Sequence, residues 1–68
     1  GDTRFSHLNP TVAGMVLAAL VDSRNGAPRL PEEIRRRLTE RDTEGQVVNG
    51  PAVEAAITAL QEAGEVLP

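Results

Sequence analysis

Aliphatic residues recur at helical spacing in three stretches of the chain, and polar segments containing proline or glycine separate them. The first stretch, residues 10–22, has apolar side chains at intervals of three and four positions, which predicts a helix. Asn9 suits its N-cap, and Pro10 suits its first turn because proline has no N–H to leave unpaired there. Gly26 can take a positive φ and end it. The helix is apolar nearly all round, so we expect it to be central and buried on several sides.

The second and third stretches predict helices over 31–41 and 51–63. Glu32 and Glu33 lie in the positive first turn of the second helix, whose inward stripe is narrow and consists of Leu30, Ile34 and Leu38. The third helix carries an apolar stripe and ends before Gly64. Residues 65–67 then favour a short edge strand, paired with 47–48 or 27–30. Alternation along a strand allows only one of Val66 and Leu67 to be deeply buried.

Together these elements predict a mainly α fold: one small domain over 9–68, preceded by a flexible N-terminal segment, 1–8, and excised from a larger protein. The chain has 68 residues, no cysteine and one histidine, so neither disulfides nor a structural zinc can support it. Aliphatic packing must hold it together. The expected core consists of Val16, Leu20, Ile34, Leu38, Val53, Ile57 and Leu60.

Two motifs carry a resemblance to a known superfamily. They are Pro31-Glu32-Glu33-Ile34 with Leu38, and the ending A-A-I-x-A-L-x-E-A-G-x-V-x-P over residues 55–68. Both resemble winged helix-turn-helix domains, and the ending is similar to the C-terminal winged-helix module of FtsK-type DNA translocases. The resemblance implies three helices with at most a short two- or three-stranded β element, and it implies DNA binding. The chain departs from that module where the latter carries Asn and Arg early in its third helix, since Pro51, Ala52 and Ala55 stand there.

The resemblance and the charge pattern suggest contact with double-stranded DNA, mainly through its phosphate backbone. The candidate contacts are cations of the second helix and N–H groups at the start of the third: Arg35, Arg36, Arg37, Arg41, Asn49 and Gly50. The net charge of −3 weighs against a general nucleic-acid binder. The alternative is a protein–protein docking domain that uses the C-terminal strand and the Ala-rich third helix, through Ala52, Ala55, Thr58, Ala59 and Glu62.

Catalysis finds no support in the sequence. His7 is the only neutral-pH base, and no motif activates a serine hydroxyl. Aligned with a calcium-binding loop, residues 40–51 place Pro51 where a bidentate Glu is required. We therefore expect no catalytic, cofactor or metal site and no small-molecule substrate. No apolar run approaches the ~20 residues of a membrane span, and we expect a cytoplasmic protein.

Overall fold

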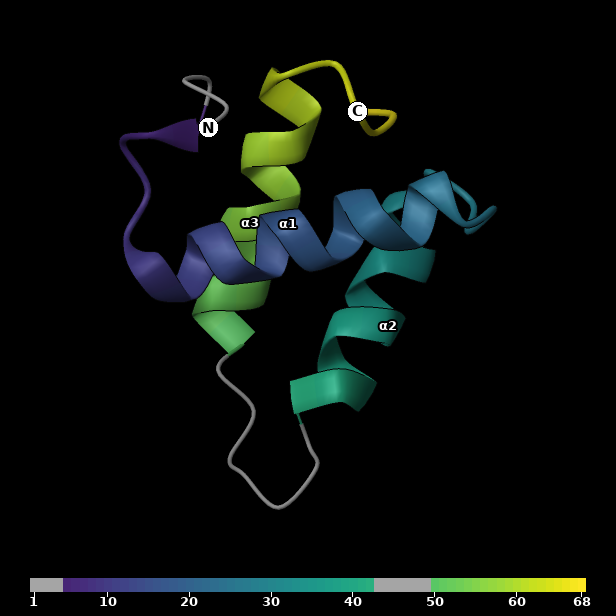
Figure 1. The fold of residues 1–68 in the computed structure, drawn as a ribbon, viewed down its shortest axis with the longest axis horizontal. Coiled ribbons are helices and arrows are strands. Elements are labelled where there is room, and N and C mark those ends of the chain that lie inside the picture. Colours follow the sequence, from purple (N-terminus) through teal and green to yellow (C-terminus); the bar gives the residue numbers. More distant parts are fainter. Residues whose placement is uncertain (1–4, 43–49) are drawn as a thin grey trace.

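The computed structural model describes residues 5–42 and 50–68, except for the side chains of residues 41 and 42. It confirms a mainly helical fold, made of α1 (Pro10–Arg24), α2 (Pro31–Asp42) and α3 (Gly50–Glu62). The first helix runs two residues beyond its predicted end, and the third begins and ends one residue earlier than predicted. Figure 1 shows α1 crossing α3, with α2 packed beside them.

The helix ends are formed by the capping residues that the sequence indicates. The Asn9 side-chain oxygen accepts a hydrogen bond of 2.9 Å from the Val12 N–H, which satisfies one of the amides left without a partner at a helix start. Gly26 and Gly64 follow the ends of α1 and α3 with φ of 101° and 76°. Because side chains disfavour this conformation, glycine is the residue that ends these helices without strain.

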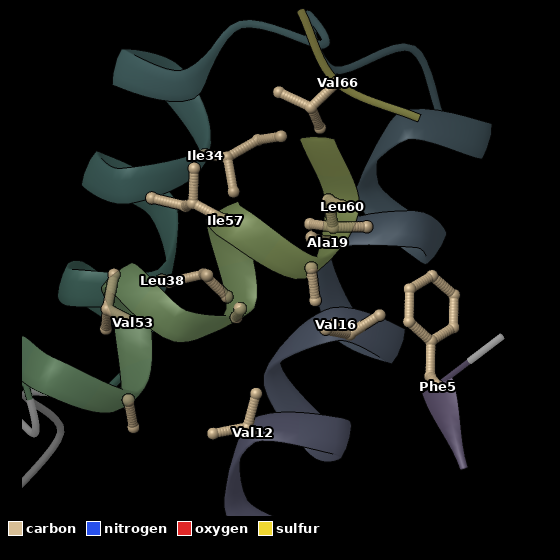
Figure 2. Close-up of a cluster of buried hydrophobic side chains, with 13 residues drawn as sticks. Phe5, Val12, Val16, Ala19, Ile34, Leu38, Val53, Ile57, Leu60 and Val66 are labelled. Atoms are coloured by element: carbon tan, nitrogen blue, oxygen red, sulfur yellow. The ribbon is translucent and has the colours of Figure 1, made fainter. Parts of the chain in front are cut away.

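One aliphatic cluster joins the three helices, and α3 lies at its centre (Figure 2). Six residues of α3 are buried, more than in α1: Ala52, Val53, Ala56, Ile57, Ala59 and Leu60. From the other elements come Val12, Val16, Ala19, Ile34, Leu38, Phe5 and Val66. The predicted core is therefore confirmed except at Leu20, which is only partly buried at the margin of the cluster. Phe5, from the polar segment before α1, is also buried in this cluster and contributes an aromatic ring to it.

The prediction that α1 is central and buried on several sides is wrong. Leu17 and Val21 of this helix are 58% and 53% exposed. The buried residues of α1 are Val12, Val16 and Ala19, which helical spacing places on the side opposite Leu17 and Val21. The contacts with α2 and α3 therefore leave these two side chains uncovered within the described residues. Leu30 is 45% exposed and does not face inward as its place in the second apolar stripe suggested.

The C-terminal segment does not form the predicted edge strand, and no strand occurs within residues 5–42 and 50–68. The Leu67 N–H donates to the Arg29 carbonyl at 3.4 Å, so the tail does lie beside 27–30. However, the Glu65 N–H already bonds the Leu60 carbonyl in the helix cap, which prevents a ladder from starting there. The predicted partner 47–48 lies outside the described residues. Only one of the two apolar residues is buried, as predicted: it is Val66, whereas Leu67 is 59% exposed.

Candidate interaction surface

The arginine run of α2 is bound to carboxylates. Arg35 donates from Nε and from a terminal nitrogen to the two carboxylate oxygens of Glu54 on α3, at 2.6 and 3.0 Å. This bidentate pair raises the pKa of Arg35 and lowers the pKa of Glu54 through its hydrogen bonds and charge attraction. It also ties the middle of α2 to the first turns of α3. Arg35 therefore serves as a link between helices in this structure.

Arg36 and Arg37 have their own acidic neighbours on α2. Arg36 contacts Glu33 at 2.8 Å and Glu40 at 3.2 Å, one turn before and one turn after it. The hydrogen bond from Arg36 lowers the pKa of Glu33. Arg37 lies 4.0 Å from Glu33, and its buried Nε atom has no hydrogen-bond partner. A phosphate would therefore have to compete with carboxylates for this run.

The remaining candidate DNA contacts are only partly placed. Gly50 is exposed at the first position of α3. Asn49 and the side chain of Arg41 lie outside what the structure describes. Of the predicted cations of the second helix, Arg35, Arg36 and Arg37 are placed, and their acidic neighbours are Glu33, Glu40 and Glu54.

The candidate docking residues on α3 divide between its two faces. Ala52 and Ala59 are 7% and 8% exposed and belong to the core, where a partner cannot reach them. Ala55, Thr58 and Glu62 are exposed. Without the two buried alanines, the outer face of α3 is small and polar, which is a weaker surface for apolar docking than its sequence suggested.

An apolar surface instead lies on α1, where the sequence predicted burial. It consists of Gly14, Leu17 and Val21, and we call it the α1 outer face. A Cβ atom added at Gly14 would meet nothing within 4 Å, so the backbone there is open to close approach. No charged residue occurs in α1 between Pro10 and Val21. A signal in the sequence could have revealed this face: the other two predicted helices each offer one apolar stripe, which is too little to cover a helix that is apolar all round.

Open hollows on the surface do not add a chemical site. One, of about 450 Å³, lies between the starts of α1 and α3 and is lined by Asn9, Pro10, Thr11, Val12, Pro51, Ala52 and Ala55. Another, of about 420 Å³, is lined by His7, Ala59, Glu62 and Ala63. Among the described residues, no group of three His, Cys, Asp or Glu side chains lies together as a metal site would require.

No helix of the described residues is long and apolar enough to cross a membrane. A scan against protein-family models finds no match for this chain, and searches of curated proteins and of solved structures find none either. Its function must therefore be inferred from the chemistry of its surface.

Proposed function

We propose that this domain is a non-catalytic binding module that docks onto another protein through the α1 outer face. The observation that carries the proposal is the exposure of Leu17 and Val21, each more than half accessible on one uncharged stretch of helix. Exposed aliphatic side chains that lie together are typical of interaction surfaces. Covering the exposed parts of these two side chains contributes about 1 kcal/mol each to binding.

The α1 outer face favours an aliphatic partner surface. It offers no cation to a phosphate and no charged group that a partner would have to neutralise. The open backbone at Gly14 suits the close approach of a helix. Burying a charged partner group here would cost free energy without compensation, so the partner side chains that meet Leu17 and Val21 should be apolar.

Contact with the DNA backbone stays a prediction, and so does the relationship to winged-helix domains. Backbone contact would require Arg35 to leave Glu54, and Arg36 to leave Glu33 and Glu40. Each phosphate contact would then replace an existing ion pair, which reduces the net gain. In favour of the winged-helix relationship, the tail lies beside Arg29, in one of the two segments predicted to pair with it.

Site-specific crosslinking tests the docking proposal. A photoreactive amino acid at position 17 should capture a protein in cells that make this domain, whereas the same group at Arg36, on the charged face of α2, should not. The captured protein is then purified and titrated against the domain. We expect Leu17→Glu to weaken its binding by at least about tenfold, because a charge replaces an aliphatic contact worth about 1 kcal/mol or more. Leu17 is exposed, so the variant should remain folded.

A titration with generic duplex DNA at increasing salt separates the two functions. The docking proposal expects no binding that depends on the arginine run. The DNA function would instead predict a complex with duplex DNA that salt weakens steeply. Replacing Arg35, Arg36 and Arg37 by Ala would abolish that complex, whereas Leu17→Glu would not. This set of results would establish the DNA function and contradict the docking proposal.

A further inference from the structure

We infer that the Asn25-Gly26 step, at the C-terminal end of α1, is a deamidation site that the folded structure holds unreactive. Both residues are exposed, and glycine has no side chain to obstruct attack by its own backbone nitrogen. That nitrogen loses its proton and attacks Cγ of Asn25. The bond from Cγ to the side-chain nitrogen breaks, that nitrogen takes up a proton from water and leaves as ammonia, and a succinimide ring forms. Water then opens the ring to aspartate or isoaspartate.

The backbone of the folded helix end prevents ring closure. To form the ring, the Gly26 nitrogen must lie nearly eclipsed with Cβ of Asn25 about the Cα–C bond. The observed ψ of 13° at Asn25 turns that nitrogen away from the side chain. The Gly26 N–H also donates to the Ser23 carbonyl at 3.1 Å, and the Ala27 N–H donates to the Asp22 carbonyl at 2.9 Å. The reaction therefore requires these bonds to open first.

Opening of this kind is a local event at the end of a helix. Helix ends open at a lower free energy than the core, because few buried contacts hold them. Once the reaction has occurred, a carboxylate stands at the negative end of the α1 dipole, where it is unfavourable. Isoaspartate also lengthens the backbone by one carbon, so the cap cannot re-form with its original geometry. The modification thus loosens the last turn of α1, which carries Val21.

Peptide-resolved mass spectrometry tests the inference. Trypsin cleaves after Arg24 and Arg29 and so isolates the segment 25–29 from the second Asn-Gly step at 49–50. The domain is incubated at mildly alkaline pH, folded in one sample and unfolded in denaturant in another. The synthetic peptide 23–29, acetylated at its N-terminus so that a peptide bond precedes Asn25 as in the chain, serves as the reference. We expect deamidation of the folded domain to be at least about tenfold slower than that of the unfolded chain, since only the opened fraction reacts.

Equal deamidation rates in the folded and unfolded samples would show that the folded structure does not protect Asn25. If the unfolded chain reacts more slowly than the peptide, Asn25-Gly26 is not the deamidation site that we infer. The variant Asn25→Asp supplies one product in pure form. It should speed amide hydrogen exchange at residues 25–27 by several-fold and leave the exchange of the α3 core unchanged. Unchanged exchange at 25–27 would contradict the proposed loosening of α1.

Discussion

Among single residues, Arg35 and Glu54 have the most direct structural role on the surface, because they connect two helices across the molecule. Both side chains are about half exposed, so water and salt screen their attraction. Their link contributes little to global stability for that reason. Its effect should be visible in the dependence of stability on pH.

We expect the Arg35–Glu54 pair to stabilise the fold at neutral pH and to lose this effect in acid. The pair lowers the pKa of Glu54 below its ordinary value of 4.5. A carboxyl with a depressed folded pKa stabilises the native state above the unfolded pKa, and this contribution disappears as the pH falls through the folded pKa. Thermal unfolding between neutral pH and pH about 3 should therefore show a smaller loss of stability for Glu54→Gln than for the original chain.

Glu32→Gln is the matched control for this measurement. Glu32 is also an exposed carboxylate, but no ion pair joins it to an arginine within 4.0 Å among the described residues. Because it has no hydrogen-bonded arginine in the described part of the chain, its replacement should change the acid loss of stability less than Glu54→Gln does. If the two variants change the acid slope equally, the pair with Arg35 does not hold in solution.

At the level of the helices, the N-terminal cap of α1 makes a local contribution to stability that one substitution can test. Asn9 bonds the Val12 N–H, and no acidic residue lies in the first turn to share that role. We expect Asn9→Ala to lower the free energy of unfolding by about 1 kcal/mol, because a helix-start amide loses its acceptor. Chemical denaturation measures this change.

Asn9→Asp is the control, since aspartate caps a helix about as well as asparagine. It should retain nearly all of the stability. If aspartate fails as alanine does, the side-chain amide of Asn9 has a role other than capping, and the assigned hydrogen bond is wrong.

The helices themselves were predictable because their signals are local. The Asn9-Pro10 start, Gly26 and Gly64 act on the backbone within one turn, so the sequence alone indicates where α1 and α3 end. The exposed face of α1 was not predictable in the same way. Whether Leu17 is covered depends on how many neighbours surround the helix, and that is a property of the packed molecule.

In the molecule as a whole, α3 is the central element, because it packs against both other helices. Leu60 is 1% exposed, and its truncation would leave a cavity between the elements. We expect Leu60→Ala to cost ~2–5 kcal/mol. That is a large share of the stability of so small a domain. Equilibrium unfolding in denaturant measures the loss.

Leu17→Ala is the comparison, because it removes the same atoms from a side chain that is 58% exposed. It should change stability by less than about 0.5 kcal/mol. Leu20→Ala should fall between the two, since Leu20 is only partly buried. Similar losses for Leu17→Ala and Leu60→Ala would mean that α1 is covered on its outer face in solution.

The candidate site was less predictable than the fold. The sequence identified Arg35, Arg36 and Arg37 as a cluster of cations, but the partner of Arg35 lies 19 positions away and depends on how α2 packs against α3. Likewise, spacing alone could not assign Ala52 and Ala59 to the core, because alanine suits either face of a helix. Surfaces depend on tertiary packing, whereas helix ends depend mainly on neighbours in sequence.

The burial of Phe5 has a consequence for how this domain can be observed. Phe5 is the only phenylalanine, with no Trp or Tyr in the chain, and the one other aromatic ring, the imidazole of His7, is exposed. Its ring lies in the same buried cluster as Val16 and Leu60 (Figure 2). Large ring-current shifts of methyl groups inside the core, such as those of Val16 and Leu60, should therefore originate from the Phe5 ring. Methyl chemical shifts in the core thus report, without an added label, whether the segment before α1 is docked.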